Sequence, residues 1–569
     1  MIAGAVLVVV VVWGLVLGAK TMSAYHHDRI GLAALEQVKA DLSPGNLTSS
    51  TSTRLLDQAH AEFVSAQADL SSPLFAPVTV VPVLGRQFRA VQDLSSAAGT
   101  VSAVGSSFIA QVQSLLDRPH TAGPERVASL QQLGAFSLSA DRQLAAIDTG
   151  PSQGLFAPLA RKHNEFVNQL YAVQVRLTKA AAVSAVVASI LKGPETYLVL
   201  AANNAEMRSG SGAFLDVGVA TTSQGSINLS DFEPSGDHIL PVGAIVPSGD
   251  FQRNWGWLDP GVDFRNLGLT PQFNVTAPLA ARMWTALTGQ KVDGVLALDV
   301  AGVEELLQVS GPVSVDGQTV GASNVVQYLL HDQYAGLTDT SGGGTQRQDA
   351  LGDLTRAVLH QLESQSSDLR TLGTAVTSAV AGRHLMMWSA GPVAQSAWEV
   401  SGVSGALTPG SVGVSLINRG GNKLDPFVPI HVTVDTARSG SDTSVTMSAR
   451  VTNDTPPGLS QFIAGPFPGV PVTYGGYFGL MAVNLPGAAR HITVSGIAPV
   501  YVKGPEGPTW VLAAPLNLAD GNSVTAVVHF VMPGPHGSMT VVPSARIPAE
   551  QWTASGRTFT DAIPTPVTW

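Results

Sequence analysis

The sequence contains no cysteine in 569 residues, which excludes disulfide bonds, thiolate metal sites and cysteine nucleophiles. Charged residues make up only 13% and hydrophobic residues 45%, so the composition excludes an intrinsically disordered chain. The formal net charge of −10 is spread thinly and no block of basic residues occurs, which argues against nucleic acid as a partner. The length predicts several structural units rather than a single core.

Catalytic signatures are also scarce. The sequence has no H-E-x-x-H pattern, no Walker loop, and no G-x-G-x-x-G between a predicted strand and a predicted helix. The 13 histidines are scattered, and the adjacent pair His26-His27 has no carboxylate at ligand spacing on the same element. We therefore expect no resident metal ion and no cofactor.

The longest hydrophobic run stands at the N-terminus. Ile2–Ala19 holds 18 uncharged, mostly apolar residues, and a helix needs about 20 such residues to cross a bilayer. A cleaved signal peptide is the alternative, but its apolar region has about 7–15 residues and ends in a small-x-small site, which "GAK" and "MSA" fit poorly. We expect an uncleaved, single-pass anchor over residues 1–22, since no later run has spanning length, with the bulk of the chain extracytoplasmic.

Three further segments are predicted from hydrophobic periodicity, and together they give an α+β multidomain fold. Over 23–192, apolar residues recur every three or four positions, as in the face Leu55, Ala59, Phe63, Ala66 and Leu70, which predicts a helical bundle or stalk. Over 193–400, short apolar runs alternate with helical patterns, which is typical of an α/β layered domain. Over 401–569, apolar runs recur about every ten residues, which predicts an antiparallel β-sandwich of about seven or eight strands.

One polar stretch interrupts the apolar runs of the predicted α/β domain. In "NNAEMRSGSGAFLDV", Asn203–Val217, two amides, a Glu–Arg pair and small residues lie between two predicted strands. Glu206 and Arg208 are two apart, so on an extended strand end they would face the same side, as an ion pair or as an anion-binding arginine beside a carboxylate.

Other charged residues follow this stretch, and Asp299 comes directly after an apolar strand, where open α/β sheets place their sites. Arginines suit a diphosphate and carboxylates suit Mg²⁺. The candidate ligand-binding residues are Glu206, Arg208, Arg253 and Arg265, and the candidate catalytic residues are Asp216, Asp250 and Asp299. The competing interpretation is that these residues cap helices, make turns and form local ion pairs.

The polar stretch resembles the marker of a bacterial family, the domain of unknown function 4012, which is common in actinobacterial envelope loci. The marker reads approximately N-x-A-E-x-R-x-x-G-G-F, and Ala213 replaces its second glycine here, so a family turn that relied on that glycine is altered. The matching residues of the marker are Asn204, Ala205, Glu206, Arg208, Gly212 and Phe214. Further family positions match at Val292–Asp299, Leu306-Leu307, Gly311–Val313, Asn324-Val325, Leu329-Leu330, Tyr334 and Val483–Ala488. The resemblance implies a signal anchor, a helical stalk and no assigned chemistry.

The order of elements over 197–315 is also similar to that of LytR-CpsA-Psr enzymes, which move glycopolymers from a lipid diphosphate carrier onto peptidoglycan. In those enzymes an Arg-Ser-Asp-Thr strand entry and a later Pro-Arg-Asp bind the diphosphate and Mg²⁺. Here Gly210-Ser211 follows Arg208-Ser209, so the aspartate is missing, and "PSGDFQRN" keeps Asp250 and Arg253 without the compact motif. This resemblance implies a diphosphate-binding cleft that could persist without catalysis.

Two main hypotheses of function follow, and a third is secretion or adhesion through the predicted sandwich. The first is a non-enzymatic protein, anchored in the cell membrane through its N-terminal helix, that binds or scaffolds cell-wall glycopolymer or lipid-linked glycan and other envelope proteins. The second is a Mg²⁺-dependent transferase or hydrolase of a polyprenyl-diphosphate-linked glycan, in which the arginines hold the diphosphate and the aspartates hold metal or act as base. Convergence of the arginines and aspartates around one cleft would favour the second.

Overall fold

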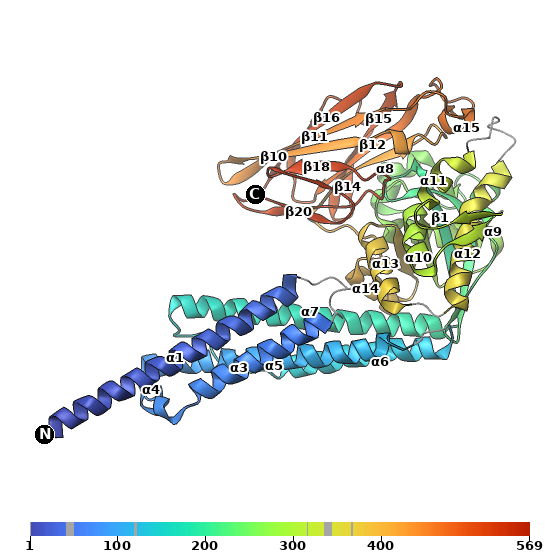
Figure 1. Ribbon diagram of the computed structural model, residues 1–569. Coiled ribbons are helices and arrows are strands. Elements are labelled where there is room, and N and C mark those ends of the chain that lie inside the picture. Colours follow the sequence, from blue (N-terminus) through green and yellow to red (C-terminus); the bar gives the residue numbers. More distant parts are fainter. Residues whose placement is uncertain (1, 41–49, 119–121, 316, 335–343, 366–367) are drawn as a thin grey trace. The chain divides into compact units, whose positions relative to one another are not determined.

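The computed structural model describes residues 2–40, 50–118, 122–315, 317–334, 344–365 and 368–569, and these fold into two compact units (Figure 1). The first, here called the helical unit, comprises 1–120, 125–188 and 368–373. The second, the sheet unit, comprises 121–124, 189–367 and 374–569. The coarse prediction of an α+β chain with N-terminal helices and C-terminal β-sheets is confirmed.

Long helices build the helical unit, because its apolar residues form stripes at helical spacing. The face predicted from residue 55 to residue 70 is buried, and Phe63 packs with Ala34 of the first helix and Ala98 of the third long helix. A Cβ on Gly31 would lie 2.9 Å from the Phe63 ring, so the first two helices pack closely. The elements are α1 (Ile2–Ala40), α3 (Ser50–Leu70), η1 (Pro73–Phe75), α4 (Ala76–Thr79), α5 (Pro82–Leu116), α6 (Pro124–Ala145) and α7 (Ala157–Lys192).

The predicted anchor falls in the first half of α1, which is helical from Ile2, but the side chains of residues 1–12 and 14 lie outside the described part of the chain. Among the described residues, one helix is long and apolar enough to cross a membrane by length and composition, namely α7. One third (33%) of its apolar window is buried inside the protein, and buried core helices pass the same test. The expectation that no run after Ala19 has spanning length is thus wrong by this measure.

The first part of the sheet unit is a mixed sheet with helices on both faces. The strand order is β3-β2-β1-β5-β8, with β4 beside β2; β1 and β5 are parallel, and the other pairs are antiparallel. Its strands are β1 (Glu195–Met207), β2 (Gly212–Ser223), β3 (Ser226–Leu229), β4 (Glu233–Pro234), β5 (Gly294–Asp299) and β8 (Leu385–Ser389).

Alternation of side chains along the strands assigns the helices to the two faces. Leu200 and Ala297 share a core with α9 (Phe273–Thr288), whereas Ala201 and Leu298 share a core with the helices of the other face. The latter are α10 (Val300–Ser310), α11 (Val325–Leu330) and α12 (Gly344–Ser364). The connecting elements are η2 (Ser235–Asp237), α8 (Gly249–Trp255), η3 (Gly256–Leu258), η4 (Phe264–Asn266), β6 (Val313–Val315), β7 (Gln318–Val320), η5 (Asp332–Tyr334), α13 (Leu369–Ala381) and α14 (Pro392–Ser401).

The second part of the sheet unit consists of two six-stranded sheets, ordered β13-β16-β11-β10-β18-β19 and β14-β15-β12-β9-β17-β20. The prediction of purely antiparallel pairing is wrong, because β10 pairs with β18 and β9 with β17 in parallel. The predicted number of seven or eight strands is also too low, because the two sheets together hold twelve strands. The spacing of apolar runs predicts strands but carries no signal of which strands pair.

The elements of this part are β9 (Ser411–Asn418), η6 (Asp425–Phe427), β10 (Ile430–Ser439), β11 (Asp442–Thr452), α15 (Gln461–Ala464), β12 (Tyr477–Pro486), β13 (Arg490–Ser495), β14 (Val502–Glu506), β15 (Thr509–Leu518), β16 (Ser523–Met532), β17 (Ser538–Val541), β18 (Gln551–Ala554), β19 (Arg557–Thr560) and β20 (Thr565–Thr568).

The sheet that contains β9 and β12 is buried on both faces. Val414 and Met481 pack with Val432 and other side chains of the first C-terminal sheet. On the opposite face, Ile417 and Leu480 join the core that surrounds α9. The mixed sheet therefore shares a hydrophobic core with the sheet that contains β9 and β12, and the polar stretch at the end of β1 and the start of β2 lies at their junction.

Candidate functional site

The marker stretch, Asn203–Val217, comprises the end of β1, the turn 208–211 and the start of β2, and every one of its residues is buried. The backbone amide of Arg208 donates to Ser211 O at 2.8 Å and closes the turn. A Cβ on Gly212 would overlap the backbone carbonyl of Asn203, so the turn requires glycine at this position. Ala213, which replaces the second family glycine, lies in β2 opposite Asn203 with no exposed surface, so its methyl group fits there.

Asn204 and Asp299 meet where the parallel strands β1 and β5 end. Asn204 Nδ2 donates to Asp299 Oδ2 at 2.8 Å and to Ala545 O at 2.8 Å, so it ties the two strand ends to the C-terminal sheets. Asp299 Oδ1 accepts the Gly302 amide at 2.9 Å and thereby caps α10. Asp299 was predicted correctly at a strand end, but it is 1% exposed and acts there as a cap.

His384 shares the carboxylate of Asp299, with Nδ1 to Oδ2 at 2.8 Å. Burial of the ring would lower the pKa of His384, but the neighbouring charge of Asp299 and its hydrogen bond outweigh burial, so the pKa of His384 is raised. Glu305 and Asp561 add to the increase. The protonated form of His384 is therefore stabilised.

Glu206 forms an ion pair with Lys423, which follows β9 in the sequence. Lys423 Nζ also lies 5.6 Å from the ring centroid of Tyr334 and 5.3 Å from that of Phe462. Burial lowers the pKa of Lys423 to about 7, and the charge of Asp425 partly opposes this. The predicted Glu206–Arg208 pair is wrong, since the acid reaches across the junction to a lysine that is distant in the sequence.

Arg208 is 7% exposed and its guanidinium is directed at backbone carbonyls. Nε donates to Arg265 O at 2.8 Å, while Nη1 donates to Met207 O at 3.0 Å and to Asn418 O at 2.9 Å. Burial lowers the pKa of Arg208, and the charge of Asp425 opposes this. These hydrogen bonds give Arg208 a structural role, because its donors hold three segments of the chain together, and its predicted role in ligand binding stays a prediction.

Asp425 is the charged centre of the same junction and is 1% exposed. Its carboxylate accepts hydrogen bonds from the Met207 amide (2.9 Å), Asn418 Nδ2 (2.9 Å), Tyr477 Oη (3.0 Å) and Arg546 Nη1 (2.9 Å). Sequence reasoning missed Lys423, Asp425 and Arg546. "GGNKLDPF" has the composition of a turn, and nothing in its spacing indicates that it meets the marker stretch.

We refer to the three marker side chains Asn204, Glu206 and Arg208, with their partners Asp299, Lys423 and Asp425, as the marker network. It joins the mixed sheet to the C-terminal sheets.

The other predicted site residues lie elsewhere. Arg253 pairs with Asp250, three residues away on α8, and Asp250 Oδ2 accepts the Gly507 amide at 2.9 Å. Arg265 forms an ion pair with Asp263, two residues before it, and Nη2 lies 2.6 Å from Oδ2. Asp216 lies buried in β2, paired in register with Ala201. Arg208 and Arg265 lie next to each other, since Arg208 Nε donates to the backbone oxygen of Arg265. Asp250 and Arg253 pair with each other on α8, and among the described residues no hydrogen bond or ion pair joins them to the marker network.

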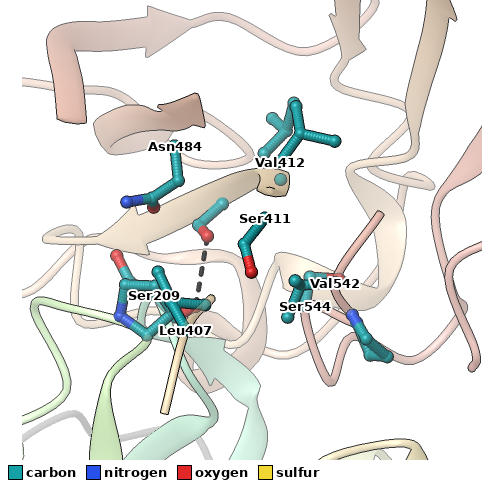
Figure 2. Close-up of a pocket in the computed structure, with 12 residues that line it drawn as sticks. Ser209, Leu407, Ser411, Val412, Asn484, Val542 and Ser544 are labelled. Carbon is teal, nitrogen blue, oxygen red and sulfur yellow. Dashed lines mark hydrogen bonds between the residues drawn. The ribbon is translucent and has the colours of Figure 1, made fainter. Parts of the chain in front are cut away.

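A cavity of about 10 Å³ lies beside the marker stretch, and Figure 2 shows Ser209, Ser411 and Asn484 around it. This volume suits roughly one water molecule and is too small for a diphosphate. Among the described residues, no three His, Asp or Glu side chains gather closely enough to hold a metal ion. The three candidate aspartates therefore do not form a shared Mg²⁺ site.

Residues 192–334 match a family model described as "Protein of unknown function (DUF4012)". The match begins just before β1 and ends at Tyr334, so it covers the marker stretch and the predicted strand β5. It supports the resemblance drawn from the marker residues over this quarter of the chain. A search of curated proteins and a search of solved structures find no match.

Proposed function

We propose that this chain is a single-pass, membrane-anchored cell-envelope protein that binds or scaffolds cell-wall glycopolymer during its assembly or export. The family likeness is proposed to extend over the whole chain, in the manner of actinobacterial envelope proteins with an anchor, a helical stalk and a C-terminal β-sandwich. Other envelope proteins are its expected partners.

The observation that carries the non-enzymatic proposal is where the marker side chains form their hydrogen bonds and ion pairs. Partners inside the protein bind the polar groups of all three side chains, Asn204, Glu206 and Arg208. The cavity beside Ser209 of the same stretch, about 10 Å³, has room for roughly one water molecule. A phosphoryl-transfer site instead needs arginines and carboxylates that converge on space for the substrate.

An exposed aromatic pair offers a surface that suits a saccharide. Trp257 and Tyr501 are 52% and 55% exposed, and their ring centroids are 6.1 Å apart at an interplanar angle of 89°. Trp257 Nε1 donates to Asn254 O at 3.0 Å, which fixes the indole ring in place. Exposed aromatic side chains that are held rigidly mark binding surfaces, and the apolar faces of sugar rings stack on them. The charged pair Asp250 and Arg253 stands on the preceding helix α8 and could accept hydrogen bonds from or donate them to hydroxyl groups.

Co-sedimentation of the detergent-solubilised full chain with bacterial cell-wall polysaccharide tests the binding proposal. We expect Trp257→Ala and Tyr501→Ala each to weaken binding about tenfold, or about 1.4 kcal/mol. Phe467→Ala is the matched control, because Phe467 is also an exposed aromatic residue (58%) of the sheet unit. Equal binding by all three variants and the unsubstituted chain would contradict the proposed surface.

The absence of cysteine allows a direct test of topology. A Ser439→Cys variant carries one thiol in the exposed hairpin between β10 and β11. We expect a membrane-impermeant maleimide to label it in intact cells. Labelling that appears only after the membrane is permeabilised would contradict the extracytoplasmic location.

Calorimetry with a polyprenyl diphosphate and Mg²⁺ tests the transferase alternative. We expect no Mg²⁺-dependent binding to the full chain in detergent. Binding that is lost in both Arg208→Met and Arg253→Met, with the fold retained, would support the enzyme instead.

A further inference from the structure

One end of the helical unit exposes apolar side chains on a loop that is held firmly in place. The loop runs from the end of α3 to the start of α5, and it is called here the apolar tip, Leu70–Gly85. No residue of the apolar tip carries a charged side chain. Val80 is 78% exposed, Val83 55% and Leu84 53%, so these side chains contribute little to the core of the protein.

The conformation of the apolar tip is fixed by contacts on its inner side. Phe75 is 4% exposed and stacks on Phe88 of α5, with ring centroids 4.5 Å apart. Arg89 Nη1 donates to Thr79 O at 3.0 Å, and the Gly85 amide donates to Val81 O at 2.7 Å. A Cβ on Gly85 would overlap the carbonyl of Thr79, so the close turn depends on glycine. The valines are therefore presented outward by an ordered loop.

A second uncharged loop lies beside the tip. Thr149–Ala160 contains no charged side chain, and Phe156 within it is 55% exposed. Gln87, two residues after the tip on α5, holds the second loop in place, because its side chain donates to Gly154 O at 3.0 Å and accepts the Phe156 amide at 2.8 Å. Phe156 thus extends the same apolar surface.

The apolar tip also contacts α1 within the predicted anchor. Trp13 Nε1 donates to Leu74 O at 3.1 Å. Trp13 precedes Ala19, the end of the apolar run, by six residues, or about 9 Å of helix. Lys20 Nζ pairs with Asp69 Oδ1 at 2.8 Å, and these are the charged residues that flank the two apolar segments. If α1 spans the membrane to Ala19, the tip lies on the membrane side of this charged pair.

Basic side chains lie around the uncharged loops. Arg86 and Arg89 follow the tip on α5, and Arg161 and Lys162 follow the second loop on α7; all four are exposed. Lys162 Nζ pairs with Glu165 at 2.7 Å, and one aspartate precedes each loop, Asp69 and Asp148, so among the described residues the basic groups at this level without an ion pair are the arginines. Lysine and arginine at this level can extend towards lipid phosphates while the adjoining apolar groups enter the acyl region. The opposite end of α5 differs, because Asp117, Arg118, Glu125 and Arg126 lie in or next to that turn.

We propose that the apolar tip, together with Phe156, inserts into the leaflet of the membrane on the extracytoplasmic side and gives the helical unit a second membrane contact beside α1. The inference rests on the proposed anchor. Its occupant is a lipid bilayer, since continuity with the anchor and the surrounding basic residues favour lipid over a second copy of the chain.

Depth-dependent quenching in vesicles tests this directly, because the chain has no cysteine of its own. The full chain is reconstituted into phosphatidylglycerol-containing vesicles with one environment-sensitive fluorophore, attached through Val80→Cys, Phe156→Cys, Leu15→Cys or Ser114→Cys. Leu15 reports on the anchor. Ser114 is the exposed control, 32 residues along α5 from Pro82 and therefore about 48 Å away.

We expect labels at positions 80, 156 and 15 to emit at shorter wavelength and to lose intensity when spin-labelled lipids are included, whereas the label at 114 does neither. Quenching at 15 but not at 80 and 156 would overturn the tip contact and leave the anchor intact. Absence of quenching at 15 would overturn the anchor, and the tip contact with it. If the label at position 80 emits at shorter wavelength but spin-labelled lipids do not reduce its intensity, the label contacts protein rather than lipid. That result would also contradict insertion.

Discussion

Asn204 Nδ2 lies 2.8 Å from Asp299 Oδ2 and 2.8 Å from the backbone oxygen of Ala545, so one amide joins two parallel strands of the mixed sheet to a segment 341 residues further along the chain. Its Oδ1 accepts the Val300 amide at 3.1 Å, which completes the bonding of the side chain. Asn204, one of the residues that carry the family resemblance, is thus a structural link at a buried junction.

The Asn204→Ala substitution should destabilise the sheet unit, because it leaves the Val300 amide and the Ala545 carbonyl without their partner. Each orphaned buried group costs about 1–3 kcal/mol, so for the two groups we expect a loss of about 2–6 kcal/mol. Guanidinium unfolding followed by tryptophan fluorescence measures it, since of nine tryptophans only Trp13 lies in the helical unit. The control is Asn228→Ala, at an exposed position of β3, which should change the free energy by less than about 0.5 kcal/mol.

Arg208→Met should cost about 3 kcal/mol or more of unfolding free energy, since three buried carbonyls lose a charged donor worth about 1.5–3 kcal/mol per bond. Arg253→Met is the matched substitution, and its exposed pair with Asp250 contributes about 0–1 kcal/mol. Comparable unfolding midpoints for the two variants would argue against a structural role for Arg208.

Gly212→Ala should be among the most damaging single substitutions in the sheet unit, because its Cβ would overlap the carbonyl of Asn203 in the adjacent strand. We expect a loss of at least about 2 kcal/mol, or failure to fold, measured by thermal unfolding. Gly410→Ala is the control, since a Cβ there meets nothing within 4 Å. The account requires a clear difference between the two glycines.

The Asp299–His384 pair gives a pH dependence of known sign. Because the pKa of His384 is raised on folding, the stabilisation is complete below the unfolded value of about 6.5 and is lost as the pH rises through the folded value. The difference in unfolding free energy between the unsubstituted chain and His384→Gln should therefore shrink as the pH increases from 6 towards 9, at about 1.4 kcal/mol per unit of pKa shift at most. A difference that grows with pH would reverse the assigned sign.

Local patterns in the sequence predict much of the fold. The apolar stripe through Phe63 is the buried face of α3, and the runs at Tyr197 and Val295 are strands β1 and β5. The position of Asp299 at a strand end was also predictable, because a polar residue directly after an apolar run marks that end. These features depend on neighbours within a few residues.

The partners of the marker residues could not be predicted in this way. Lys423 and Asp425 are distant from Glu206 and Met207 in the sequence, and they meet because the sheet of β9 and β12 packs against the core around α9. A buried arginine that binds backbone carbonyls has the same sequence signature as one that binds an anion. Only the fold shows where its donors point.

A double-mutant cycle between Glu206 and Lys423 tests the central claim most directly, because these two side chains belong to the two parts that the marker network joins. The measurement is the unfolding free energy of the full chain, of Glu206→Gln, of Lys423→Met and of the double variant. Each single variant should lose about 3–5 kcal/mol, since it leaves one buried charge without its partner. The double variant should lose less than the sum by at least about 1 kcal/mol. Additivity within about 0.5 kcal/mol would show that the two residues are energetically independent and would contradict the account.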